Sequence, residues 1–192
     1  LLIIEYEGTA YHGWQMQKNG ISVQELVEKA LTKITKTKTT VLSSGRTDAG
    51  VHAEGMPAHF VTESKMKPLE FLYALNSNLP LDITVKEVER VSMSFNARGS
   101  VKKKLYRYTI LNRDHPSALN YRRSWFIPHK LDIAAMKRAA NYFVGKHDFT
   151  SFRAVNCNSK TPVRILNRVE IFKHDGFLRI EFEGKGFLKH MV

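Results

Sequence analysis

An amphipathic helix is predicted near the start of the chain, and its stripe of apolar residues requires a partner surface. Ser22 and Glu25 have the spacing of a capping box, which satisfies free N–H groups at the start of a helix. Apolar residues then recur on one helical face, at positions 23, 26, 27, 30, 31 and 34. A helix with this stripe buries it against a sheet or another helix, so we expect a layered fold.

The segments around this helix are expected to supply the sheet. Residues 1–6 are apolar and extended in character, and a strand is predicted at 57–61, which Pro57 would place at a sheet edge. Residues 68–75 predict a second helix and 83–91 another strand. The order strand, helix, strands, helix, strand is typical of split βαβ, or ferredoxin-like, folds.

The second half of the chain predicts fewer elements. A strand is predicted at residues 104–111, and Asp132 is expected to cap a helix that Gly145 ends. Two further strands, 165–172 and 177–183, flank a strong hairpin turn. This half lacks the closing helix and strand of the first half, so a C-terminal helix and strand are expected to be missing.

We therefore predict an α+β protein with two ferredoxin-like halves, residues 1–103 and 104–192, whose antiparallel or mixed sheets meet at a central basic cleft. Residues 1–100 contain 11 Lys and Arg against 11 Asp and Glu, whereas residues 101–192 contain 19 against 7. The net charge of +12 therefore arises in the second half and favours a polyanionic partner. No apolar run is long enough to span a membrane, so a cytoplasmic location is expected.

A short loop concentrates the residues suited to catalysis. It reads Gly45-Arg46-Thr47-Asp48-Ala49-Gly50-Val51-His52-Ala53. Gly45 and Gly50 permit backbone conformations that can hold one carboxylate rigidly. Arg46 beside Asp48 favours an ionised carboxylate, as a nucleophile requires. For so short a motif, an ordinary surface Arg/Asp pair is the competing interpretation.

Taken as one string, residues 45–53 closely resemble the signature of the tRNA pseudouridine synthases of the TruA family. This resemblance implies that Asp48 is the catalytic residue and that Tyr106 lies against the target nucleotide. Three other segments are also similar to that family: Gly13-Trp14-Gln15, Lys104-Leu105-Tyr106-Arg107-Tyr108 and the run from His147 to Arg153. Family members continue after the final Met-Val into an arginine, a helix and a strand, which this chain does not include.

The resemblance implies an enzyme that isomerises uridine to pseudouridine in the anticodon arm of tRNA, at positions 38 to 40. It also implies a homodimer that needs no cofactor and no metal. A paired uridine must be extruded from its stack, so Arg46 could fill the vacated space and Tyr106 could stack on the flipped base. Basic residues are expected to contact the RNA backbone, namely Lys102, Lys103, Lys104, Arg122, Arg123 and Arg153. The residues alone leave open whether Asp48 attacks C1′ of the ribose or C6 of the uracil.

Two other classes of function fit parts of the sequence. A non-catalytic RNA-binding protein on the same scaffold would use the charge and the tyrosines, but would give the loop around Asp48 no purpose. A metal-dependent nuclease or phosphotransferase would need clustered acids, and only Glu54 lies near Asp48 in the sequence. The single cysteine, Cys157, offers no metal-ligand spacing. Trp14 is expected to anchor its loop on the core rather than to contact RNA.

Overall fold

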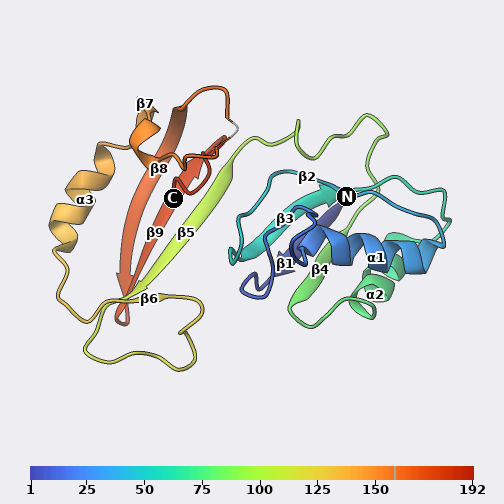
Figure 1. The fold of residues 1–192 in the computed structure, drawn as a ribbon, viewed down its shortest axis with the longest axis horizontal. Coiled ribbons are helices and arrows are strands. Elements are labelled where there is room, and N and C mark those ends of the chain that lie inside the picture. Colours follow the sequence, from blue (N-terminus) through green and yellow to red (C-terminus); the bar gives the residue numbers. More distant parts are fainter. Residues whose placement is uncertain (158) are drawn as a thin grey trace. The chain divides into compact units, whose positions relative to one another are not determined.

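The computed structural model describes residues 1–157 and 159–192 and divides the chain into two compact units, Leu1–Val101 and Lys102–Val192. Each unit combines one β-sheet with helices, so the predicted α+β class with two sheets is confirmed (Figure 1). None of the helices formed by the described residues is long and apolar enough to cross a bilayer.

The first unit has the predicted order of elements. These are β1 (Leu2–Tyr6), α1 (Val23–Thr35), β2 (Leu42–Ser43), β3 (Ala53–His59), α2 (Pro68–Asn76) and β4 (Ile83–Val88). The strands lie in the order β2-β3-β1-β4, and every neighbouring pair is antiparallel. This order confirms the ferredoxin-like arrangement that the sequence predicts for the first half.

The core of the first unit lies between the two helices and one face of the sheet. The hydroxyl of Ser22 accepts the N–H of Glu25 at 3.3 Å and starts α1, as predicted. The apolar stripe of α1 and alternate residues of β1 are buried together, among them Val23, Val27, Leu31, Leu2, Ile4 and Tyr6. Trp14 also belongs to this core and is 2% exposed, which confirms its predicted anchoring role.

Two predictions for the first unit are wrong in detail. Pro57 does not mark an edge strand, because β3 pairs with β1 on one side and with β2 on the other. The Pro57 carbonyl accepts the N–H of Ser44 at 2.8 Å, just where β2 has ended at Ser43, so the missing proline N–H falls where regular pairing stops. The strand predicted over 83–91 ends at Val88.

The second unit contains more short elements than the sequence predicts. It comprises β5 (Lys104–Leu111), β6 (Trp125–Phe126), α3 (Ile133–Asn141), β7 (Gly145–Asp148), a 3₁₀ turn (Thr150–Phe152), β8 (Val163–His174) and β9 (Phe177–Gly184). The sheet order is β6-β5-β9-β8-β7, and only the β5–β6 pair is parallel. The helix α3 packs against β8 on one face of this sheet (Figure 1).

The turns of the second unit follow the predicted chemistry, with one exception. Asp132 accepts the N–H of Ala135 at 2.8 Å and caps α3, as predicted. Asp175 and Gly176 both have positive φ and form the two-residue turn between β8 and β9. Gly145 does not end the helix, because α3 stops at Asn141 and Gly145, with a φ of +107°, begins β7 instead.

Candidate active site

The loop that carries Asp48 leaves the sheet at the end of β2 and returns at the start of β3. Its first turn is fixed by two hydrogen bonds: the Ser43 hydroxyl donates to the Gly45 carbonyl at 2.6 Å, and the Ser44 N–H donates to Pro57. Ser44 itself is buried. The loop therefore departs from the sheet in a defined direction.

A tight turn follows directly after Asp48. The Asp48 carbonyl accepts the N–H of Val51 at 3.2 Å, and Gly50 adopts a φ of +77°, which favours glycine. Positive φ occurs at Gly50 but not at Gly45, so only one of the two glycines is needed for its backbone angle. The turn holds Asp48 half-buried, whereas Arg46 is exposed.

A second loop, residues 8–14, packs closely against the loop that carries Asp48. This close packing explains why the second loop has glycine at two positions. Gly13 has a φ of +82°, and a Cβ at this position would lie 2.4 Å from the Thr47 carbonyl oxygen. A Cβ on Gly8 would lie 2.1 Å from the carbonyl oxygen of Val51. The two loops thus approach each other backbone to backbone on both sides of Asp48, which leaves no room for side chains at these contacts.

Hydrogen bonds join the two loops at the same places. The Trp14 N–H donates to the Thr47 carbonyl at 3.2 Å, and the Gly50 N–H donates to the Tyr11 carbonyl at 3.2 Å. Because Trp14 is buried, the residue next to Asp48 is tied to the core of the unit.

Two side chains add to this support. The Tyr6 hydroxyl, at the end of β1, lies 2.7 Å from the Thr47 hydroxyl. The Nδ1 atom of His52 accepts the N–H of Gly8 at 2.9 Å and lies 3.4 Å from a carboxylate oxygen of Glu7. Asp48 is thus a half-buried carboxylate in a loop fixed from β1, β2, β3 and residues 8–14.

Tyr106, the second residue that the sequence points to, lies in the other unit. It stands in the middle of β5 opposite Phe182 of β9 and is half-buried. Its ring meets Phe187 edge to face, with the centroids 4.7 Å apart. Tyr108 shares the same strand face and is 43% exposed. Tyr106 therefore has an aromatic neighbour that fixes its ring.

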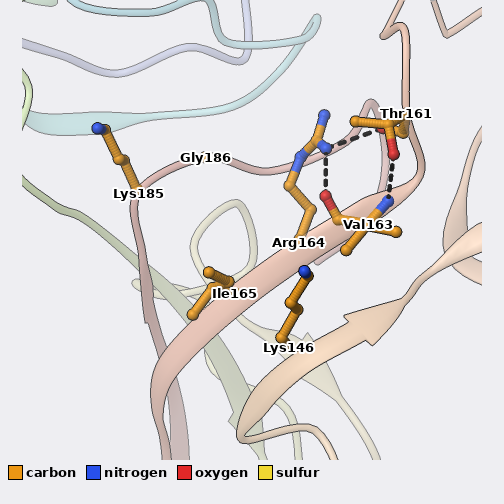
Figure 2. Close-up of a pocket in the computed structure, with 7 residues that line it drawn as sticks. All are labelled: Lys146, Thr161, Val163, Arg164, Ile165, Lys185 and Gly186. Atoms are coloured by element: carbon orange, nitrogen blue, oxygen red, sulfur yellow. Dashed lines mark hydrogen bonds between the residues drawn. The ribbon is translucent and has the colours of Figure 1, made fainter.

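The second unit contains a basic pocket that the sequence analysis did not predict. Lys146, Arg164 and Lys185 line it together with Thr161, Val163, Ile165 and Gly186 (Figure 2). These residues come from β7, the loop before β8, β8 itself and the segment after β9, so sequence spacing alone could not bring them together. The available signals were Lys185 between two glycines and the run Val163-Arg164-Ile165, and neither is specific.

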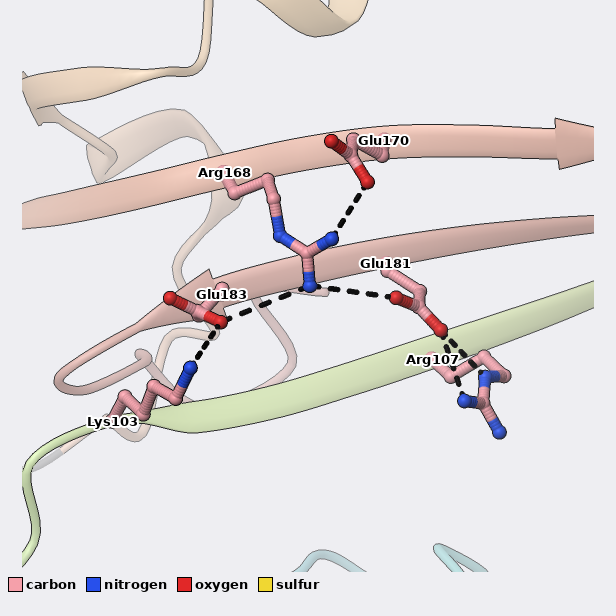
Figure 3. A network of polar contacts seen from close by, with 6 residues as sticks. All are labelled: Lys103, Arg107, Arg168, Glu170, Glu181 and Glu183. Carbon is pink, nitrogen blue, oxygen red and sulfur yellow. Dashed lines mark hydrogen bonds and ion pairs between the residues drawn. The ribbon is translucent and has the colours of Figure 1, made fainter.

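The lysines expected to bind RNA differ in their surroundings. Lys103 pairs with Glu183 at 3.1 Å, in a network that continues through Arg168 to Glu181 (Figure 3). Arg107 completes the network from β5, at 2.9 Å from Glu181. This network occupies the face of the sheet opposite Tyr106, because neighbouring residues of a strand point to opposite faces. Lys102 is exposed, and Lys104 is half-buried.

The expected RNA-binding arginines also differ. Arg122 and Arg123 are exposed in the connection between β5 and α3, and the Arg122 guanidinium lies 5.2 Å from the centre of the Tyr121 ring. Arg153 instead braces its own loop, donating to the carbonyls of Cys157 at 2.7 Å and Ser159 at 3.1 Å. Its role in RNA binding stays a prediction.

The segment from His147 to Arg153 contains a hydrogen-bonded turn. Asp148 accepts the N–H of Thr150 at 2.8 Å and its hydroxyl at 2.5 Å. The hydroxyl bond, together with the backbone bond, lowers the pKa of Asp148. Asp148 therefore serves as an ionised cap of the turn.

Within the described residues, no group of three His, Cys, Asp or Glu side chains is placed to hold a metal ion.

Comparison of the sequence with known proteins identifies the family of this chain. The family described as tRNA pseudouridine synthase matches residues 2–98 and 139–192, which include the loop around Asp48. The chain is 47% identical over 191 residues to the tRNA pseudouridine synthase A of Acetivibrio thermocellus, covering 100% of this chain and 78% of that protein. It is 48% identical over 191 residues to the enzyme of the same name from Geobacter sp. strain M21, covering 100% and 77% respectively. The chain therefore belongs to the tRNA pseudouridine synthase family of isomerases.

Proposed function

We propose that this chain converts uridine to pseudouridine in the anticodon stem-loop of tRNA, at positions 38 to 40, with Asp48 as the catalytic residue. The observation that carries the proposal is the way Asp48 is held. Its neighbours on both sides bond to the Trp14 backbone and the Tyr11 backbone, and glycines at the contacts let the two loops meet. Such rigid placement of one carboxylate is what a reaction at a single sugar or base carbon needs.

The reaction rearranges bonds within one nucleotide. The bond between N1 of uracil and C1′ of ribose breaks, the uracil turns, and a bond between C5 and C1′ forms. C5 loses its proton, N1 gains one, and no atom is gained or lost overall. Asp48 would assist by bonding to C1′ as N1 leaves, as carboxylates do at other glycosidic centres, and would be displaced when C5 bonds to C1′. In the alternative route it would add to C6 of the uracil and leave again after the bond between C5 and C1′ has formed.

Other residues would prepare the target nucleotide. A uridine in a stem must leave its stack, which costs a few kcal/mol. The exposed guanidinium of Arg46, two residues from Asp48, is suited to fill the vacated space or to hold a phosphate. Tyr106, with its ring fixed against Phe187, is suited to stack on the flipped base. Exposed cations at Lys102, Arg122 and Arg123 would contact the backbone without reading sequence.

The direct test is pseudouridine mapping on an unmodified tRNA transcript incubated with this chain. Carbodiimide labelling followed by primer extension locates the modified uridines, and Asp48→Ala is the control. Conversion at anticodon-stem uridines that is absent with the variant supports both the reaction and the catalytic residue. Conversion that persists in Asp48→Ala would contradict the role of Asp48, and conversion only outside the anticodon arm would contradict the substrate site.

The assembly and location form a further part of the proposal. The family resemblance implies a homodimer in the cytoplasm, and a protein that acts on tRNA would meet its substrate there. Sedimentation equilibrium at micromolar concentration tests the assembly, since a homodimer has twice the mass of the 22.0 kDa chain.

A further inference from the structure

We propose that the basic pocket of the second unit binds a backbone phosphate of the RNA substrate. This inference rests on the proposed function in one respect, that the partner is tRNA. The pocket has a volume of about 570 Å³ and is lined by Lys146, Arg164 and Lys185 with four uncharged residues (Figure 2). Its size falls within the range of sites that hold a nucleotide-sized ligand.

The register of the sheet explains why these cations gather. Lys146 of β7 stands directly opposite Ile165 of β8, and Leu166 of β8 stands opposite Gly184 of β9. Lys146 and Lys185 therefore flank the same stretch of β8 from its two sides. Gly184 allows the close approach, because a Cβ there would lie 2.7 Å from the carbonyl oxygen of Ile165.

Arg164 has its guanidinium fixed by the loop before β8. Its NH1 group donates to the carbonyls of Thr161 at 2.8 Å and Val163 at 2.6 Å. Its NH2 group donates to the hydroxyl of Ser159. Because these partners are neutral, they orient the guanidinium without cancelling its charge. A cation that is already oriented loses little freedom when it meets a phosphate.

No acid compensates the pocket. None of the lining residues is acidic, and within residues 1–157 and 159–192 neither Lys146 nor Lys185 forms an ion pair. This contrasts with the adjoining region of the sheet, where Lys103, Arg107 and Arg168 all meet glutamates (Figure 3). Three like charges around one hollow repel each other, and an anion placed among them relieves that repulsion.

The rest of the lining suits a nucleotide rather than a bare ion. Val163 and Ile165 supply apolar surface, and Ile165 is 53% exposed. A Cβ on Gly186 would meet no atom within 4 Å, so there is open space beside this residue. Apolar surface for a ribose with cations for its phosphate is a common composition of RNA-backbone sites. The pocket would read shape and charge, not base identity.

The test compares two double variants that remove the same charge. Lys146→Gln/Lys185→Gln alters the pocket, whereas Lys137→Gln/Lys173→Gln alters exposed lysines of α3 and the far end of β8. The affinity for an unmodified tRNA transcript is measured by filter binding over a range of monovalent salt. We expect the pocket variant to weaken binding about ten-fold or more, and to reduce the slope of log affinity against log salt by about 0.7 to 0.9, the value for the loss of one phosphate contact. The matched variant should change the slope by less than half as much.

Equal losses of affinity and slope in the two variants would overturn the proposal, because they would show general attraction without a site. Inorganic phosphate is the second probe, monitored through the NMR signals of the Lys146 and Lys185 side-chain methylenes. If phosphate shifts these signals while tRNA affinity is unchanged in the pocket variant, the site takes small anions and the RNA assignment is wrong. Pseudouridine formation is measured separately at saturating enzyme, so absence of the reaction is told apart from absence of this contact.

Discussion

The hydroxyl of Tyr6 lies 2.7 Å from the hydroxyl of Thr47, so the end of the central strand β1 bonds to the residue that precedes the candidate catalytic carboxylate. Tyr6 is 2% exposed and belongs to the core of the first unit. Core packing and the position of Asp48 are therefore coupled through one hydrogen bond.

Tyr6→Phe keeps the buried ring and removes this hydroxyl. We expect a loss of about 1 kcal/mol in the free energy of unfolding, the usual value of one such bond. Turnover should fall by roughly ten-fold with little change in tRNA affinity, because small errors in placing a reacting group are costly. Urea unfolding and single-turnover rates measure the two effects. Tyr73→Phe, at a 65% exposed position on α2, is the control and should change neither.

Asp48→Asn tests the role of the carboxylate with almost no change in shape. We expect turnover to fall by at least about 10³-fold, as happens when a nucleophile is removed. Affinity for tRNA should stay within about three-fold, because the lost interaction belongs to the reaction and not to binding. The control is Glu54→Gln, which removes a nearby exposed acid and should leave the rate near that of the parent protein. Normal turnover of Asp48→Asn would show that the nucleophile is assigned wrongly.

Gly13→Ala tests the contact between the two loops. The new Cβ would lie 2.4 Å from the Thr47 carbonyl oxygen, and the φ of +82° disfavours alanine. We expect a destabilisation of at least about 2 kcal/mol, since left-handed backbone alone costs about 1 to 2 kcal/mol. Gly186→Ala is the matched control, because its Cβ would meet no atom within 4 Å and should change the urea midpoint little. Equal stability of the two variants would mean that the loops do not need their close approach.

Tyr106 can be divided into its ring and its hydroxyl. Tyr106→Ala should slow the reaction more than it weakens tRNA binding, because the flipped base loses its stacking partner, worth about 1 to 3 kcal/mol. Tyr106→Phe keeps both the ring and its edge-to-face contact with Phe187, so it should retain most of the activity. Rates and dissociation constants are measured on the same tRNA. Parallel losses in rate and affinity for the alanine variant would reduce Tyr106 to a binding residue.

Tyr11 predicts a pH dependence of stability. Burial, followed by the hydrogen bond that its hydroxyl donates to Asp82, raises the pKa of Tyr11 above the ordinary value of 10.0. The folded state then holds this proton more tightly than the unfolded chain does. The resulting stabilisation is fully present below pH 10 and is lost as the pH rises above it. Urea unfolding at pH 8 and pH 11 should show a smaller advantage of the parent protein over Tyr11→Phe at the higher pH, and a constant advantage would contradict the linkage.

Local patterns were sufficient for the elements that carry strong periodicity. The stripe from Val23 to Leu31 and the Ser22 cap predicted α1, and Asp175-Gly176 predicted the hairpin of β8 and β9. Short strands had no comparable signal. The two-residue strand β6 and the four-residue strand β7 depend on the neighbours they pair with, which only the folded chain brings together.

In the candidate site, too, local features could be predicted from the sequence and long-range contacts could not. Asp48 could be identified from its own loop, because residue types and spacing are local information. The groups that hold it could not, since Tyr6 and Gly13 lie 41 and 34 residues from Thr47 in the sequence. Pro57 was misjudged for a similar reason: its missing N–H matters only on the side where β2 happens to end.

The ion-pair network on the sheet of the second unit changes how the charge of that unit is distributed. Three glutamates, Glu170, Glu181 and Glu183, are matched there by Lys103, Arg107 and Arg168. Setting these six aside, residues 101–192 retain 16 of their 19 Lys and Arg but only 4 of their 7 acids. The patch with the network therefore has balanced charges, while the rest of the unit carries a net positive charge. The electric field of this uneven charge would exert a torque during the encounter with a polyanion. The torque would orient the positive surface of the unit toward the polyanion before any contact forms.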